Sequence, residues 1–225
     1  MEEESLSVLQ RAQVMMNNIT ISINSAGKRF NREWIFRNLN YQFLSGNSYG
    51  IIGFNGSGKS TLLQCIAGSM MLNEGSISYN NNTLNSIIIN ENIFQSIAIC
   101  TPYLEMIEEM TSTEFLQFHQ QFKPLINNFS TQEIINVIGL EKAANKQIRH
   151  FSSGMKQRLK LAQAIFSDTP ILLLDEPCTN LDKEGNRLYH QLINDYCNNK
   201  LLIICSNEEA EIEFCSERLN IVDYK

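Results

Sequence analysis

The stretch Gly53-Phe-Asn-Gly-Ser-Gly-Lys-Ser-Thr61 decides the fold class of this chain. A strand-like run, Tyr49-Gly-Ile-Ile52, precedes it, and a helical pattern begins near Lys59. The glycines allow positive φ angles and close approach, so that successive backbone N–H groups can point at phosphate oxygens. The positive end of the helix dipole favours negative charge at the same place. The stretch therefore predicts a loop that binds the phosphates of a nucleotide.

Two side chains of this loop are expected to act on the nucleotide directly. Lys59 would reach the β- and γ-phosphates, and the Ser60 hydroxyl would ligate Mg2+. The other predicted nucleotide-binding residues of the loop are Asn55, Gly56, Ser57, Gly58 and Thr61. An ordinary glycine-rich turn could match part of this pattern. The strand before it, the helix after it and the complete G-x-x-x-x-G-K-S spacing argue against that interpretation.

Composition and charge exclude several classes of protein. The chain has 225 residues and a formal net charge of −6, which disfavours a nucleic-acid-binding protein because phosphate backbones need a basic surface. The longest apolar run, 170–174, ends at Asp175 and is far too short to span a membrane. The N-terminus lacks the basic and apolar regions of a signal peptide. The six cysteines form no C-x-x-C pair and are expected to be reduced core residues, which favours a soluble intracellular protein.

Hydrophobic patterning divides the chain into parts. Residues 1–16 are polar and acidic and look appended, whereas 17–225 is expected to form a single domain. Up to residue 100 the pattern consists of short strands separated by Gly and Asn turns, and from 103 to 150 it becomes helical. Strands are predicted at 19–23, 35–44, 48–53, 75–79, 86–89, 96–100, 170–174 and 200–205. Strands that alternate with helices imply a largely parallel sheet with helices on both faces, into which 103–150 is inserted as a helical lobe.

Helix ends are also readable in the sequence. The helix after the predicted phosphate loop should end at Gly68. Thr111-Ser-Thr-Glu114 and Ser130-Thr-Gln-Glu133 have the form of capping boxes and predict two helix starts in the lobe, with Gly139 ending the second helix. Further helices are predicted at 155–167 and 183–198, and a final helix is followed by a short last strand.

Two further segments could contribute to a phosphate site. Ser152 and Gly154 immediately precede an amphipathic helix, where free N–H groups and a hydroxyl can bind an anion, although a serine N-cap is ordinary and this signal alone is weak. Asp175 and Glu176 end a buried strand, at the sheet edge where α/β proteins bind ligands. Asp175 is predicted to hold Mg2+ and Glu176 to polarise the attacking water. The alternative is that the two acids cap the next helix.

Taken in order, these elements resemble the ATP-binding cassette (ABC) ATPase family, from about residue 17 to the end. The loop 53–61 matches the Walker A motif, and Phe151-Ser-Ser-Gly-Met-Lys-Gln-Arg158 is similar to the signature motif, usually Leu-Ser-Gly-Gly-Gln. Leu172-Leu-Leu-Asp-Glu-Pro177 matches Walker B with its catalytic glutamate, and Thr179-Asn-Leu-Asp182 matches the D-loop. The predicted fold class is therefore α/β: a P-loop NTPase core with a largely parallel sheet, an antiparallel β subdomain and an inserted helical lobe.

The resemblance implies ATP and Mg2+ as ligands and a head-to-tail dimer of ATPase subunits, either a homodimer or a heterodimer. Each ATP would lie between the phosphate loop of one subunit and the Ser152–Gly154 segment of the other. An aromatic residue upstream of Walker A is expected to stack on adenine. Phe30 stands where the family places it, and Trp34 is a second candidate. The alternative is that Phe30 belongs to the core.

Two positions depart from the family pattern. Asn207 stands in place of the switch histidine, and its amide can donate a hydrogen bond to a γ-phosphate but cannot carry a positive charge. Tyr103 follows Pro102 where the family has the Q-loop glutamine. A lost charge-assisted hydrogen bond is worth roughly 1.5–3 kcal/mol, or about 10- to 150-fold in rate. None of the histidines is placed by the sequence to substitute; they are His119, His150 and His190. We expect a slow ATPase in which Glu176 is intact.

The leading interpretation is the ATP-binding and hydrolysing subunit of an ABC transporter, which powers a separate membrane permease through ATP-dependent dimerisation. The alternative is a nucleotide-gated clamp or regulatory ABC protein with little or no hydrolysis, which Asn207 and Tyr103 favour and Glu176 opposes. Translation-associated members normally carry two cassettes, and chromosome or repair members insert long coiled coils, whereas Gly58 to Ser152 shows no heptads. The signature form looks more like bacterial exporter-type ATPases than importer subunits.

The expected partner is a separate transmembrane permease, and no nucleic acid. In the family such a partner docks in the groove between the core and the helical lobe, near the Q-loop. This region carries Glu105, Glu108 and Glu109, which would suit a basic coupling helix, although a solvated acidic surface is an equal alternative. The expected location is the cytoplasm, peripheral on the inner face of the cell membrane through the permease.

Overall fold

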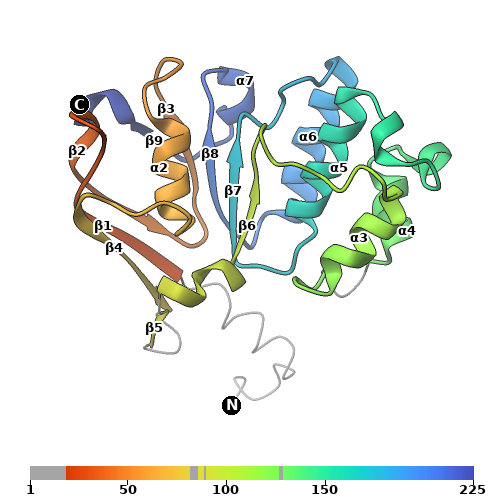
Figure 1. Cartoon of the computed structure of the whole chain (residues 1–225), viewed down its shortest axis with the longest axis horizontal. Helices are drawn as coiled ribbons and strands as arrows, with labels where there is room; N and C mark the ends of the chain where they lie inside the picture. Colours follow the sequence, from red (N-terminus) through yellow and green to blue (C-terminus); the bar gives the residue numbers. More distant parts are fainter. Residues whose placement is uncertain (1–18, 82–85, 89, 127–128) are drawn as a thin grey trace, which may run out of the picture.

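A parallel sheet and an antiparallel sheet form the framework of the molecule (Figure 1). The computed structural model describes residues 19–81, 86–88, 90–126 and 129–225. The segment 1–16 that looks appended lies outside these residues. The antiparallel sheet has the order β2-β1-β4-β5. Its strands are β1 (Ile19–Phe30), β2 (Glu33–Leu44), β4 (Glu74–Asn81) and β5 (Ser86–Ile88).

All strand pairs of the second sheet are parallel, as the alternation of strands and helices predicts. Its order is β6-β7-β8-β3-β9. The strands are β3 (Ser48–Ile52), β6 (Ile97–Cys100), β7 (Ile171–Asp175), β8 (Leu201–Cys205) and β9 (Glu217–Asn220). Because these strands run in one direction, their carboxyl ends meet at one edge of the sheet, and the loops that leave them lie close together.

Helices cover both faces of the parallel sheet (Figure 1). α2 and the antiparallel sheet lie on one side, and α5 and α6 lie on the other, with α3 and α4 beyond them. The helices are α2 (Lys59–Ile66), α3 (Ser112–Gln120), α4 (Thr131–Val137), α5 (Ser153–Ile165), α6 (Lys183–Tyr196) and α7 (Glu209–Ile212). Short 3-10 turns occupy Asn90–Gln95, Glu141–Ala143, Ile148–His150 and Ile221–Tyr224. The described residues of segment 103–150 thus contain two α-helices and two such turns.

The helix-end predictions are confirmed at atomic detail. Both capping boxes form: Thr111 and Ser130 each accept a hydrogen bond from the backbone N–H three residues later, and the glutamate there accepts one in return. Gly68 and Gly139 have φ angles of 72° and 68°, in the left-handed region that ends helices. α5 begins at Ser153 instead of 155, because the Ser152 hydroxyl caps it by accepting from Met155 N.

One strand prediction is too short. β1 continues to Phe30, although the pattern predicts 19–23. The added part is irregular, since the register with β2 shifts between Ile23 and Arg29, and Ser25 has a positive φ of 46°. The Ser25 N–H donates to Asn40 Oδ1 at 2.8 Å. The period-two pattern is lost at these shifts, so the extension depends on pairing with β2 and is not visible in local sequence.

Alternation along the central strands divides the core into two layers. Leu172 and Leu174 of β7 pack with α5, α6 and the lobe helices, whereas Ile171 and Leu173 pack with α2 and the antiparallel sheet. β8 alternates in the same way. Both strands are buried on both faces, which explains why their sequences are continuous apolar runs. These two strands carry the acidic and amide residues of the site at their carboxyl ends.

A polar cluster joins α3 to the end of α5. Gln163 Nε2 donates to His119 Nδ1 at 2.9 Å, so we assign the other ring nitrogen of His119 as the donor to Ser167 Oγ at 2.8 Å. The Ser167 hydroxyl donates in turn to the Gln163 carbonyl at 2.6 Å. Burial, together with the charge of Lys123, lowers the pKa of His119 to about 4. The folded protein therefore holds this imidazole neutral.

This cluster predicts a loss of stability in mild acid. Because the pKa of His119 is lower in the folded state than its ordinary 6.5, protonation favours unfolding, and stability falls as the pH drops from about 6.5 to about 4. The ring is only partly buried, so we expect a loss of about 1–2 kcal/mol instead of the ~3.4 kcal/mol that the full shift implies. Denaturant unfolding across this pH range should show this loss, with His119→Gln reducing it and His150→Gln, at an exposed histidine, leaving it in place. An identical pH dependence in His119→Gln would contradict the prediction.

Candidate nucleotide-binding site

The loop after β3 has the backbone that a phosphate cradle needs. Gly53, Gly56 and Gly58 have φ angles of 150°, 79° and 108°, which side chains rarely allow. A Cβ atom on Gly58 would lie 2.3 Å from Cγ2 of Ile35, and one on Gly53 would lie 2.6 Å from the Ser57 hydroxyl. Glycine is therefore required at both positions for the loop to close onto α2. The helix begins at Lys59 and points its N-terminus into the same space.

A cavity of about 410 Å³ opens beside this loop, at the carboxyl edge of the parallel sheet. It brings together the loop, the segment after β6 and the end of β7. The lining residues are Ile35, Asn55, Gly56, Gly58, Lys59, Ser60, Thr61, Pro102, Tyr103, Asp175 and Glu176. Of the predicted loop residues, Ser57 does not line it; its side chain is fully buried and its hydroxyl has no hydrogen-bond partner among the described residues.

Lys59 is held inside the site by three oxygen atoms. Its Nζ donates to the carbonyls of Gly53 and Phe54 at 2.8 and 3.3 Å and to Asn207 Oδ1 at 2.7 Å. The Asn207 amide donates in turn to Asn55 Oδ1. The chain thus supplies the oxygens that a bound phosphate would otherwise offer to this ammonium group. Sequence reasoning missed this bridge, because Asn207 and Lys59 are 148 residues apart.

Asp175 is suited to a hard cation. Its side chain is 3% exposed, and Oδ1 has no hydrogen-bond partner among the described residues. Burial raises the pKa of Asp175, and the Ser60 hydroxyl beside it opposes that shift. An unpaired buried carboxylate oxygen is costly unless a ligand satisfies it. One carboxylate and one hydroxyl at the phosphate loop match the oxygen donors that Mg2+ prefers, so these two residues fit the predicted metal.

Glu176 lies between two cavities. It lines the cavity of Lys59 and also a second one of about 390 Å³, together with Asn55 and Asn207. Its φ of 44° is unusual for a side-chain-bearing residue, and its N–H donates to the Cys205 carbonyl at 2.9 Å. The alternative that the acids cap the next helix is wrong, because Asp182 is the N-cap of α6 and accepts from Gly185 N at 2.8 Å.

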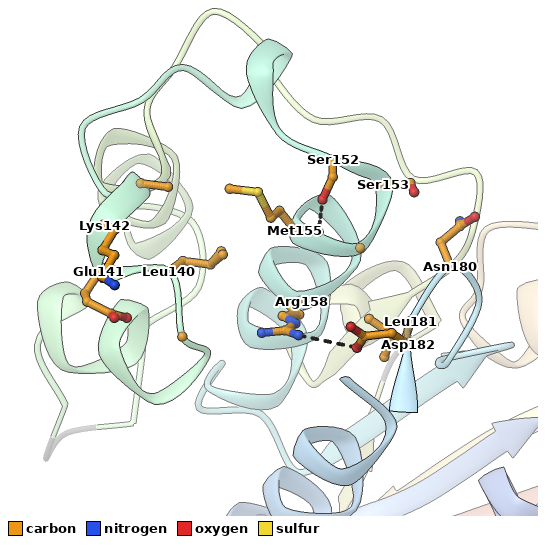
Figure 2. Close-up of a pocket in the computed structure, with 13 residues that line it drawn as sticks. Leu140, Glu141, Lys142, Ser152, Ser153, Met155, Arg158, Asn180, Leu181 and Asp182 are labelled. Carbon is orange, nitrogen blue, oxygen red and sulfur yellow. Dashed lines mark hydrogen bonds and ion pairs between the residues drawn. The ribbon is translucent and has the colours of Figure 1, made fainter. Parts of the chain in front are cut away.

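The Ser152–Gly154 segment opens on a separate cavity of about 440 Å³ (Figure 2). None of the residues that line it also lines the cavity of Lys59. A Cβ on Gly154 would lie 3.2 Å from the Asn180 carbonyl, a tight contact with the segment between β7 and α6. Across this cavity Arg158 forms an ion pair with Asp182 at 3.6 Å, as Figure 2 shows. Within one chain, the two predicted phosphate-binding segments therefore do not share a site.

The aromatic candidates lie outside the cavity of Lys59. Phe30 is 47% exposed at the end of β1, so the alternative that it belongs to the core is wrong. Its ring has the Lys28 ammonium at 5.3 Å. Trp34 is half-buried, with the guanidinium groups of Arg29 and Arg37 at 5.4 and 4.5 Å from its ring. Phe30 is thus the more accessible of the two rings, and its stacking on adenine stays a prediction.

The two departures from the family pattern both lie at the site. Tyr103 lines the cavity and is 89% exposed, so its ring is not held by the fold. The preceding Pro102 carbonyl accepts from Lys160 Nζ at 2.8 Å. Asn207 reaches the phosphate loop directly through Lys59 and Asn55, as described above. The histidines line neither cavity that Glu176 lines; they are His119, His150 and His190.

Three contributors have no role predicted from the sequence, although Gln157 lies within the stretch 151–158 that is similar to the signature motif. Ile35 packs on the phosphate loop, Gln157 Nε2 donates to the Pro177 carbonyl at 2.7 Å, and Glu211 accepts from Cys178 N at 3.0 Å. Each comes from an element remote in sequence. Gln157 and Glu211 are buried polar residues inside helices, which is the one signal that could have drawn attention to them.

Comparisons with known proteins find relatives of this chain. A profile described as "ABC transporter" matches residues 36–179. The chain is 30% identical over 193 residues to YybJ of Bacillus subtilis, described as an uncharacterized ABC transporter ATP-binding protein, and spans 87% of it. It is also 30% identical to the cytochrome c biogenesis ATP-binding export protein CcmA of Reclinomonas americana, of which it spans 85%. It spans 21% of the ABC transporter A family member 11 of Dictyostelium discoideum, again at 30% identity.

Solved structures share the fold at lower identity. A putative ABC transporter ATP-binding protein from Pyrococcus furiosus superimposes with a TM-score of 0.76 at 18% identity, covering 92% of this chain and 99% of that one. A bacterial Atm1-family ABC exporter with ATP bound also gives 0.76, at 17% identity, with 38% of its chain covered. The predicted P-loop NTPase fold is therefore confirmed. Among the residues that the structure describes, no helix is both long and apolar enough to cross a membrane.

Proposed function

Because this chain belongs to the ABC transporter family of ATP-binding proteins, we propose that it hydrolyses Mg-ATP to drive a separate membrane permease. One observation carries the proposal: Lys59, Asp175 and Glu176 converge on a single cavity beside a glycine loop with phosphate-binding geometry. These three groups supply what phosphoryl transfer needs, namely a cation for the phosphates, a ligand for Mg2+ and a base for water. ATP binding follows from the family, and the residue roles below are our inference.

In the proposed mechanism, Lys59 exchanges its present oxygen partners for the β- and γ-phosphates. The loop N–H groups and the N-terminus of α2 orient the same phosphates. Ser60 and Asp175 would hold Mg2+, which neutralises phosphate charge when bound. Glu176 accepts the proton of the attacking water. Asn207, once released from Lys59, can turn its amide N–H groups towards the γ-phosphate.

The separation of the two predicted phosphate-binding segments supports the proposal of a dimer. The Ser152–Gly154 segment has its own cavity, which shares no lining residue with the cavity of Lys59. A second subunit, identical or different, would place this segment on the exposed side of the nucleotide. Asn180 and Leu181 line both the Ser152 cavity and the cavity shared by Glu176 and Asn207, so the segment between β7 and α6 connects the two. We propose ATP-dependent dimerisation on this face.

The permease would dock beside the segment that follows β6, from the cytoplasmic side of the membrane. Glu105, Glu108 and Glu109 are exposed there, and Ile107 is 41% exposed among them. Glu108 is already paired with Lys156 of α5, which leaves the other two carboxylates for a basic segment of the partner. A surface that carries both exposed carboxylates and an exposed apolar side chain would suit an amphipathic basic helix of the partner. A surface of carboxylates alone would offer this helix no apolar contact.

Turnover of Mg-ATP by the purified chain tests the proposed function. If two subunits complete each site, the rate per subunit should rise with protein concentration and level off as the dimer forms. Chelation of Mg2+ should abolish it. A chain that binds ATP but shows no turnover at any concentration would refute self-sufficient hydrolysis and favour the nucleotide-gated clamp.

The replaced switch residue should limit the rate. In the mechanism above, Asn207 offers a neutral amide where a histidine would offer a charged donor, so Asn207→His should raise kcat about 10- to 150-fold. The measurement is kcat at saturating Mg-ATP, beside the control Asn198→His, at an exposed asparagine that lines neither cavity of Glu176. Equal turnover in Asn207→His and the wild type would show that this position does not limit hydrolysis.

A further inference from the structure

Glu211 is a buried acid that the proposed mechanism does not use. It lies on the short helix α7, and its side chain is 4% exposed. One carboxylate oxygen accepts a hydrogen bond from Cys178 N at 3.0 Å, and the other has no partner among the described residues. Burial raises the pKa of Glu211. A buried carboxylate costs stability unless its contacts offset that cost, so the bond to Cys178 N is the contact that calls for an explanation.

The bond from Cys178 N fixes a turn that is strained by itself. The segment between β7 and α6 contains Glu176 and Asn180, whose φ angles of 44° and 66° lie in the left-handed region. This conformation is unfavourable for a residue with a side chain, and it persists only where neighbouring contacts hold it. The turn therefore needs anchors, meaning hydrogen bonds to residues from other parts of the chain.

Three anchors hold three successive residues of this turn. Glu176 N donates to the Cys205 carbonyl, the Pro177 carbonyl accepts from Gln157, and Cys178 N donates to Glu211, at 2.9, 2.7 and 3.0 Å. The first two anchors come from β8 and α5, which are regular elements of the core. The third comes from α7, four residues beyond Asn207, and is the one that ties the turn to the segment following β8.

Glu211 therefore connects the turn that carries Glu176 with the segment that carries Asn207. Glu176, Asn207 and Glu211 line the same cavity of about 390 Å³. Tyr189 of α6 donates its hydroxyl to the Glu211 carbonyl at 3.0 Å, so α7 is itself held against the helix that follows the turn. A displacement of α7 would be transmitted through one hydrogen bond to the residue two positions after Glu176.

We propose that Glu211 is a positioning residue for ATP hydrolysis, which keeps the turn carrying Glu176 in register with the segment carrying Asn207. The inference rests on the proposed function, because Glu176 is the base only if the chain is an ATPase. Glu211 touches neither nucleotide nor water in this role. Its contribution is the acceptor oxygen at Cys178 N, and not its charge.

Three substitutions separate the acceptor from the charge. Glu211→Ala removes the acceptor and should lower kcat about 10- to 100-fold, with the KM for ATP within about threefold, because Lys59 and the glycine loop are untouched. Glu211→Gln retains an acceptor oxygen without a charge and should keep most of the turnover. Glu213→Ala removes an exposed acid of the same segment and serves as the control.

Hydrogen exchange gives a readout that does not depend on turnover. In Glu211→Ala the amides of Glu176 and of 178–182 should exchange about 10-fold faster or more than in the wild type, while Glu211→Gln should protect them. Wild-type turnover in Glu211→Ala would overturn the proposal, as would a folded Glu211→Gln as impaired as Glu211→Ala. A wild type that never turns over ATP would refute the ATPase proposal, whereas the exchange rates would still decide whether Glu211 holds the turn. If Glu211→Ala does not fold, Glu211→Gln decides the outcome by the same two measurements.

Discussion

Glu176→Gln is expected to lower kcat for Mg-ATP about 100- to 10,000-fold, the range typical of a lost general base. The glutamine keeps the shape of the side chain and an acceptor oxygen, but its amide cannot take a proton from water. The unusual φ of Glu176 and its backbone bond to Cys205 do not involve the carboxylate, so the turn should remain folded. The measurement is single-turnover hydrolysis with the protein in excess over ATP.

ATP binding should survive this substitution. Lys59, the glycine loop and Asp175 are unchanged, and removal of a negative charge near the phosphates favours binding, so the Kd for Mg-ATP should be equal or lower. Glu184→Gln, at an exposed acid of α6, is the matched control and should keep wild-type turnover. Undiminished hydrolysis in Glu176→Gln would show that another group activates the water and would remove the basis of the proposed mechanism.

Lys59→Met should raise the Kd for Mg-ATP about 100- to 10,000-fold. The ammonium would contact two phosphate groups, and hydrogen bonds between charged partners contribute roughly 1.5–3 kcal/mol each. Methionine matches the length of the side chain but carries no donor. It also leaves the Gly53 carbonyl and Asn207 Oδ1 without the partner that the wild type provides. Equilibrium titration with a fluorescent ATP analogue measures the effect.

The control for this experiment is Lys183→Met, which removes an exposed lysine at the start of α6. It should bind ATP as the wild type does. Thermal unfolding without nucleotide separates loss of binding from loss of fold, since the three bonds of Lys59 also support the loop. A melting temperature close to the wild type together with unchanged affinity would contradict the role of Lys59.

Much of the architecture is determined locally. The glycine loop, both capping boxes and the helix-ending glycines Gly68 and Gly139 each depend on residues within a few positions, so their patterns are readable without the fold. The continuous apolar runs of β7 and β8 identify strands buried on both faces, and the structure divides their side chains between two core layers. The alternation of these strands with helices correctly predicted the parallel sheet.

What the sequence by itself determined is that the glycine loop and the two acids Asp175 and Glu176 stand at the carboxyl ends of parallel strands. That these residues bind phosphate and Mg2+ stays a prediction. Tertiary structure alone decided three further points: the extension of β1 to Phe30, the bridge from Asn207 to Lys59, and the bond from Cys178 N to Glu211. Each of these depends on groups that are far apart in the chain or on a register shift between strands. Local propensity reports the energy of a residue with its neighbours, whereas these contacts exist only because the sheet brings distant loops to one edge.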